Sequence, residues 1–216
     1  MALTQLPSAN PQAAPTPKGV RPIAFVGDDT ALVAALRNQH PGAKAAVFDR
    51  FERHIRRVVV HIMGPTADVA DALQDVFLNA FKSVHTLQDP AALRPWLTRV
   101  AVLTTRKWLR QRRRRSWIRL FSKHEDEEQF EPEAPPSSEA SRALRVAYRI
   151  LDTLPEADRI AFGLRFVEGM ELTEVASACG VSLATIKRRL SRAQADFMRL
   201  AAADPALGAW TKGGTP

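Results

Sequence analysis

Residues 172–190 contain the pattern that most narrows the fold of this chain. Gly180 follows a short segment of helical character and can adopt the left-handed conformation that ends a helix. Ser182 is a good N-cap for a following helix, and Ile186 and Leu190 lie four residues apart on one face of that helix. The stretch therefore predicts two helices joined by a tight corner, which is a helix-turn-helix.

The second helix of this motif carries small and polar residues in its first turn and cations after them. Such a helix suits the major groove of DNA, because its first turn reaches base edges while Lys and Arg engage phosphates. A solvated surface helix is the alternative interpretation of the same cations. We predict DNA contacts for Ser182, Leu183, Thr185, Lys187, Arg188, Arg189 and Arg192.

Helical periodicity also dominates the rest of the chain. Apolar residues recur three and four apart through residues 28–116 and again through residues 139–203. In the first of these units, helices are expected over about residues 28–40, 44–63 and 66–84 and from residue 93 onward. Phe48 and Phe51 belong to the apolar positions of the second helix. The sequence thus predicts an all-α protein of two small helical domains.

The remaining segments lack this periodicity. Residues 1–27 are rich in proline and predict a disordered tail. Residues 117–138 combine acidic residues with prolines and predict a flexible acidic linker. Residues 204–216, rich in Gly, Pro and Ala, predict a frayed end.

Net charge favours a polyanionic partner. The chain has 31 Lys and Arg against 23 Asp and Glu, a net charge of +8. Basic residues are densest between Arg106 and Arg115, where the fourth helix ends. Such a run can be merely solvated, but at the end of an amphipathic helix we interpret it as a second phosphate-contacting surface.

A single cysteine, Cys179, excludes an intramolecular disulfide and a thiolate metal cluster. We expect it to fill the corner of the helix-turn-helix as a small hydrophobe, and nothing in the sequence supports a redox role. A cytoplasmic location is the default expectation. No stretch approaches the ~18–20 consecutive apolar residues of a membrane span, and residues 1–14 lack the order of a signal peptide, so we expect neither membrane insertion nor secretion.

An enzyme such as a nuclease or recombinase would need convergent carboxylates for metal ions or an activated nucleophile. Asp68, Asp71 and Asp75 recur on one helix face but lack His or Glu partners, so we interpret them as a protein-docking surface. His54 and His61 have no neighbouring ligand in the sequence and are treated as ordinary histidines. We expect no catalytic residue, no metal and no cofactor.

Three segments, in chain order, resemble motifs of the extracytoplasmic-function (ECF) sigma factors of bacterial RNA polymerase, within the sigma-70 family. Residues 71–81, DALQDVFLNAF, resemble the part of region 2 that docks on the polymerase. Residues 93–97, LRPWL, resemble the Trp-Leu signature at the start of the promoter-melting helix. LPE at 154–156, FVEGM at 166–170 and the helix-turn-helix are similar to region 4.

The resemblance covers about residues 28–202 and implies a specificity subunit rather than a catalyst. It implies binding to core RNA polymerase, at the β′ clamp helices and the β flap, recognition of the −35 and −10 promoter elements, and promoter melting. It implies core-polymerase docking by Asp71, Gln74, Asp75 and Phe77. It implies contacts with the −10 region and phosphates by Trp96, Arg99, Arg106, Lys107, Arg110 and Arg113. An anti-sigma factor is the further partner that the family implies.

The sequence departs from the family pattern in the fourth helix, which has Val102-Leu103 where a polar Arg-Asn pair is common and Lys107 at a usual acidic position. Trp96 lies on the same helical stripe as Leu93 and Val100, so core packing is the alternative to a DNA contact. The alternative function is a two-domain helix-turn-helix transcriptional regulator whose N-terminal domain senses a ligand or partner.

Overall fold

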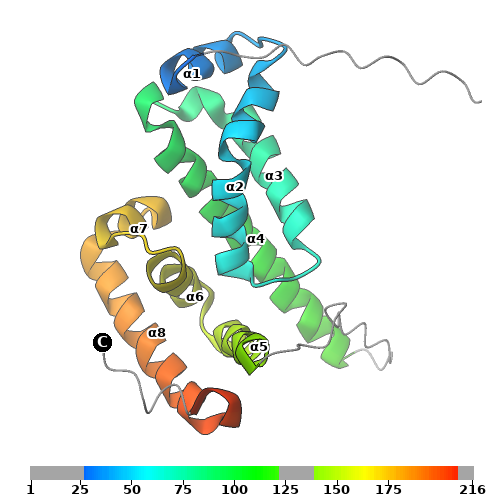
Figure 1. The fold of residues 1–216 in the computed structure, drawn as a ribbon, viewed down its shortest axis with the longest axis vertical. Helices are drawn as coiled ribbons and strands as arrows, with labels where there is room; N and C mark the ends of the chain where they lie inside the picture. The colour runs from blue at the N-terminus through cyan, green and yellow to red at the C-terminus, as the bar shows by residue number, and fades with distance from the viewer. Residues whose placement is uncertain (1–26, 122–138, 209–216) are drawn as a thin grey trace, which may run out of the picture.

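The structure is a computed structural model that describes residues 27–121 and 139–208. All regular elements in these two stretches are helical, as the sequence predicts (Figure 1). The predicted tail over 1–26, the acidic segment 122–138 and the end 209–216 lie outside the described residues.

The N-terminal unit contains the elements α1 (Asp29–Arg37), α2 (Ala43–Met63), α3 (Val69–Ser83), η1 (Val84–Thr86), η2 (Pro90–Ala92) and α4 (Leu93–Phe121). The Asp28 carboxylate caps α1 by accepting a hydrogen bond from the amide of Ala31 at 2.8 Å. Gly64, with φ of +83°, ends α2. Helices α2, α3 and α4 pack against one another through their apolar faces.

The C-terminal unit contains α5 (Glu139–Thr153), α6 (Glu156–Phe162), the π-helical turn η3 (Gly163–Val167), α7 (Leu172–Cys179) and α8 (Leu183–Ala203). The predicted helix-turn-helix is confirmed as α7 and α8. Gly180 is left-handed, with φ of +65° and ψ of +37°. The Ser182 hydroxyl caps α8 by accepting from the amide of Thr185 at 3.2 Å. Ile186 and Leu190 are buried on the inner face of α8.

Several element ends differ from the predictions. α3 begins at Val69 rather than near residue 66, and α4 continues to Phe121, past the expected domain end at 116. Leu207, in the segment expected to fray, is buried in a small cluster between α5 and the end of α8. Phe51 is buried as predicted, whereas Phe48 is 42% exposed.

The two helical units pack directly against each other (Figure 1). α7 and α6 lie against α4, and η3 lies against α2. Their apolar residues form one continuous core, in which Ile160, Leu164 and Val175 join Ile62 and Leu97. The sequence predicts two units on a flexible tether, but it gives no sign of this shared core.

Candidate nucleic-acid interface

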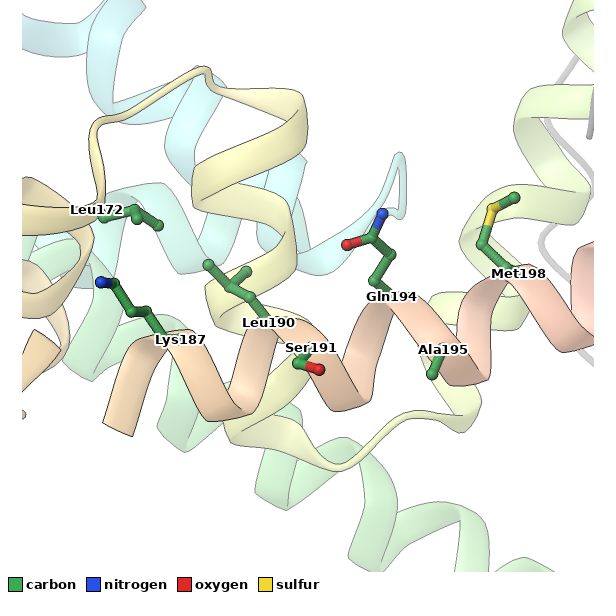
Figure 2. Close-up of a pocket in the computed structure, with 7 residues that line it drawn as sticks. All are labelled: Leu172, Lys187, Leu190, Ser191, Gln194, Ala195 and Met198. Carbon is green, nitrogen blue, oxygen red and sulfur yellow. The ribbon is translucent and has the colours of Figure 1, made fainter. Parts of the chain in front are cut away.

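The first turns of α8 present the face predicted to contact DNA. Ser182, Leu183, Lys187 and Arg188 are exposed, and Thr185 and Arg189 are half-buried. The Ser182 and Thr185 hydroxyls lie 2.9 Å apart at the start of the helix. Along a neighbouring face of α8, Figure 2 shows an open groove lined by Leu172, Lys187, Leu190, Ser191, Gln194, Ala195 and Met198. Polar hydroxyls followed by cations are therefore accessible on one helix.

Arg192 differs from the other predicted DNA contacts because it is bound within the protein. Its Nε donates to Asp158 Oδ2 at 2.6 Å, and its Nη2 donates to Asp158 Oδ1 at 2.8 Å. Asp158 belongs to α6, and its side chain is fully buried. This hydrogen-bonded pairing raises the pKa of Arg192. The guanidinium of Arg192 is thus directed toward α6.

Of the α4 residues predicted to contact the −10 region, some form ion pairs within the protein and others are exposed to solvent. The side chains of Arg106 and Arg110 both donate to the carboxylate of Glu156 on α6, the second with Nε 2.8 Å from Oε2. Arg99 is exposed and lies beside Gly180, at the corner between α7 and α8. Lys107 and Arg113 are exposed.

Trp96 packs against the core, which was the alternative to a DNA contact in the sequence-based interpretation. Its indole is half-buried against the shared core, and Nε1 lies 3.4 Å from the hydroxyl of Thr86. Trp96 therefore has a structural role: it packs against the shared core of the two units.

The predicted polymerase-docking residues also divide by exposure. Asp71 and Gln74 are exposed on α3. Asp75 is half-buried and accepts a hydrogen bond from Nε1 of Trp108 at 3.0 Å, which ties α3 to α4. Phe77 is only 3% exposed and packs against the Phe48 ring at a centroid distance of 4.9 Å. Its burial assigns it to the core in this structure.

A cluster of polar side chains of which the sequence gives no sign joins the two units around Glu168, which directly follows η3. The Glu168 side chain is 4% exposed, and its carboxylate accepts from Arg57 Nη2 at 2.5 Å. Nδ1 of His61 lies 2.9 Å from Glu168 Oε2, and Nδ1 of His54 lies 3.6 Å from Oε1. Its three partners are all on α2, over a hundred residues away in sequence, so no local pattern signals the contact.

Arg159 on α6 makes a second link between the units. Its side chain is 4% exposed, with Nε donating to the carbonyl of Ile62 and Nη2 to that of Met63, both at 2.7 Å. A third nitrogen, Nη1, donates to Asp152 on α5. The last carbonyls of a helix have no partner within it, so Arg159 satisfies the C-terminal end of α2.

Comparison with known protein families identifies two matching regions in this chain. The family model for sigma-70 region 2 matches residues 47–115, and the model for sigma-70 region 4 matches residues 144–195, in that order on one chain. The chain belongs to the ECF sigma factors of the sigma-70 family.

Similar curated sequences come from several bacteria. The probable RNA polymerase sigma factor RfaY of Xanthomonas campestris is 32% identical over 176 residues, covering 76% of this chain and 43% of RfaY. The ECF RNA polymerase sigma factor SigE of Mycolicibacterium smegmatis is 30% identical, covering 64% of this chain and 53% of SigE. The ECF sigma-E factor of Escherichia coli K12 is 26% identical, covering 77% of this chain and 90% of that protein. This sigma factor therefore spans about half the length of the first two relatives and most of the third.

Two solved structures share the fold. CnrH, in complex with the cytosolic domain of CnrY, superposes with a TM-score of 0.57 at 23% identity, covering 82% of this chain and 98% of CnrH. The sigma factor RpoE of Bartonella quintana, in complex with the anti-sigma factor NepR, gives 0.52 at 20% identity, covering 73% of this chain and 95% of RpoE.

No group of three or more His, Cys, Asp and Glu residues in the described parts of this sigma factor is arranged to hold a metal ion. None of its described helices is long and apolar enough to cross a membrane. Cys179 is half-buried, and burial raises the pKa of its thiol, which disfavours the reactive thiolate. Cys179 therefore has the packing environment expected for a corner residue.

The stability of this sigma factor is expected to fall on mild acidification through His54. Burial, and next the nearby charge of Arg94, lower the pKa of His54 below its ordinary value of 6.5; Glu168 opposes this shift and Arg57 adds to it. As the pH falls below 6.5, His54 gains a proton in the unfolded chain before it does in the folded one. The free energy of unfolding should therefore decrease between that pH and the lower folded-state pKa.

Urea unfolding at pH 7.5 and 5.5 measures this effect in the wild type and in His54→Gln, whose amide can retain the 2.9 Å contact with Thr98. The loss of stability on acidification should be smaller in His54→Gln than in the wild type. His85→Gln, at an exposed histidine of η1, is the control and should match the wild type. An identical pH dependence of His54→Gln and wild type would contradict the assignment.

Proposed function

We propose that this chain acts as a promoter-specificity subunit: it binds core RNA polymerase, recognises the −35 and −10 elements and promotes melting. The observation that carries the proposal is the exposed first part of α8 in a helix-turn-helix, on the same chain as a region 2 unit with a basic helix end. A non-enzymatic role fits this assignment. A ligand-sensing regulator is disfavoured, because it has no need of a region 2 unit.

For the −35 element, the proposed contacts lie at the N-cap and in the first two turns of α8. Ser182, Leu183 and Thr185 are placed to meet base edges, and Lys187, Arg188 and Arg189 to meet bases or phosphates. For the −10 region, we retain Arg99, Lys107 and Arg113 as direct contacts, and Arg106 and Arg110 once they leave Glu156. A contact from Trp96 requires its indole to leave the core.

For the polymerase, we propose a docking surface on α2 and α3 that combines charge and apolar area. Asp71 and Gln74 supply polar contacts, and Phe48 and Leu78, 42% and 45% exposed, supply apolar ones. Phe77 supports Phe48 from beneath, and Asp75 orients α3 through Trp108. This surface is the proposed contact with the β′ clamp helices, and region 4 is the proposed contact with the β flap.

The docked arrangement of the two units has a consequence for promoter binding. The single carboxylate of Glu156 pairs with both Arg106 and Arg110, and α7 lies against α4, so part of the proposed −10 surface is engaged within the protein. We propose that the units separate when the sigma factor engages polymerase and promoter. An anti-sigma factor is a proposed partner, because CnrH and RpoE are both seen in complexes with other proteins, one of them an anti-sigma factor. The proposed place of action is the cytoplasm, where the polymerase is.

Reconstituted transcription tests the proposal. Purified chain is mixed with bacterial core polymerase and a library of promoter fragments, and transcripts are sequenced from their 5′ ends. Transcripts that require the chain and share upstream elements are expected. If no chain-dependent transcript forms and the chain also fails to bind core polymerase, the proposed function is wrong.

Reversing charge at the docking surface should separate polymerase binding from folding. Asp71→Arg is expected to weaken binding to core polymerase by about tenfold, since ~1.4 kcal/mol corresponds to that factor. The exposed position of Asp71 predicts little change in thermal unfolding. Asp49→Arg, an identical charge change at an exposed position of α2, is the control. Fluorescence anisotropy of labelled chain against core polymerase measures both, and equal affinities of the two variants would contradict the assignment.

A further inference from the structure

The contact between Arg192 and Asp158 is the best-defined polar link from the recognition helix to the rest of its unit. Both nitrogens on one edge of the guanidinium bond to the two carboxylate oxygens, at 2.6 and 2.8 Å. This two-pronged geometry fixes direction as well as distance. Arg192 keeps 55% of its side chain exposed, whereas the Asp158 side chain is fully buried.

Because Asp158 is buried, replacing Arg192 alone would cost considerable stability. An ionised carboxylate without a partner is strongly disfavoured in the interior, and Asp158 accepts its side-chain hydrogen bonds from Arg192. The first turn of α6 adds a favourable helix dipole, and among the described residues Arg192 alone supplies a full opposite charge by direct contact. Rotating or sliding α8 relative to α6 would break both hydrogen bonds at once.

The position of Arg192 along α8 also argues against its being a direct contact with the DNA backbone. Arg192 lies nine residues after Leu183, more than two turns beyond the start of the helix. Arg188 and Lys187, which precede it, are exposed and form no ion pair in the described structure. In the first half of α8, Lys187 and Arg188 are therefore accessible, whereas Arg192 is bound to α6.

The neighbouring residue extends this link to the other unit. Consecutive helical residues point about 100° apart, so Asp158 and Arg159 leave α6 in different directions. Asp158 holds α8, and Arg159 holds the carbonyls of Ile62 and Met63 at the end of α2. α6 thus connects the recognition helix to the N-terminal unit through two adjacent side chains.

We propose that Arg192 is a positioning residue, not a phosphate contact: through Asp158 it fixes the rotation of the recognition helix on α6. The proposal rests on the proposed function, since it assumes that α8 reads the −35 element. It replaces the sequence-based expectation that Arg192 contacts DNA. It also adds Asp158, a buried residue that cannot touch DNA, to the residues that determine −35 recognition.

The test measures specific binding of reconstituted holoenzyme to a promoter with an intact −35 element, over a range of salt concentrations. Each phosphate contact adds about one unit to the slope of log affinity against log salt concentration. Arg188→Ala, at an exposed cation, is the reference and should lower the slope by about one. Arg192→Ala should weaken specific binding by about tenfold or more while leaving the slope at its wild-type value.

Three further variants separate positioning from charge. Asp158→Ala should weaken specific binding about as much as Arg192→Ala. Arg192→Lys keeps the charge but loses the paired geometry, so it should not restore wild-type affinity. The double variant Asp158→Ala/Arg192→Ala should bind no more weakly than either single variant, because both remove the same link. The double variant also leaves no buried unpaired carboxylate, so it provides a folded sample if Arg192→Ala unfolds.

The proposal is overturned if Arg192→Ala lowers the salt slope by about one, if Arg192→Lys restores binding, or if Asp158→Ala binds like the wild type. A wild-type holoenzyme that ignores the −35 element would instead refute the proposed function. The wild-type measurement therefore distinguishes the two failures before any variant is compared.

Discussion

Replacing Arg159 with methionine is expected to release the two helical units from each other. The substitution keeps apolar volume but leaves the carbonyls of Ile62 and Met63 without their donors in a buried place. It also removes the partner of Asp152. A buried acceptor that loses its donor typically costs about 1–3 kcal/mol, so the loss at the two carbonyls is a large part of the stability of a small domain.

Small-angle scattering and urea unfolding measure this prediction. Arg159→Met should increase the radius of gyration and lower the urea midpoint. Arg149→Met, at an exposed arginine of α5, is the matched control and should leave both quantities unchanged. A compact Arg159→Met variant with wild-type stability would show that the link does not hold the units together.

Gly163→Ala is expected to force the same interface apart by a steric route. A Cβ at this position would lie 2.6 Å from the carbonyl oxygen of His61 and 3.2 Å from its carbonyl carbon. Both neighbours are backbone atoms of α2, so no side chain can rotate away to make room. Overpacking of a close contact costs about 1–3 kcal/mol, and here that cost falls on the contact between the units.

The opened variant should also free Arg106 and Arg110 from Glu156. The free Gly163→Ala chain is therefore expected to bind duplex DNA non-specifically more tightly than the wild type at low salt. Thermal unfolding and anisotropy with a labelled duplex measure the two effects. Gly208→Ala is the control, because its added Cβ would lie 3.4 Å from the carbonyl of Ala202, within its own unit. Unchanged unfolding of Gly163→Ala would contradict the steric argument.

Local sequence rules accounted for the elements that carry the candidate site. Gly180 ends α7 in the left-handed conformation, and Ser182 caps α8. These features depend on residues within one or two turns of each other, so the chemistry of each residue and its spacing suffice to predict them. Apolar periodicity likewise placed Ile186 and Leu190 inside.

The same rules do not predict burial and side-chain pairing that depend on which helix lies opposite. Phe48 and Phe51 share an apolar pattern, yet only Phe51 is buried. Phe77, which the family resemblance implies at a docking surface, is 3% exposed and packs against the Phe48 ring. Arg192 has the spacing of a DNA contact, but α6 brings a buried carboxylate to it.

By itself, the sequence determined that this chain is helical, that it carries a helix-turn-helix and that its cations gather toward the C-terminal end of α4 and in the first half of α8. Only the tertiary structure decided which of those cations are available. Glu156, Asp158 and Glu168 each bind arginines that are 34 to 111 residues away. Periodicity reports which side of a helix is apolar, whereas an ion pair between helices depends on their relative position and rotation, which arise from packing the whole core.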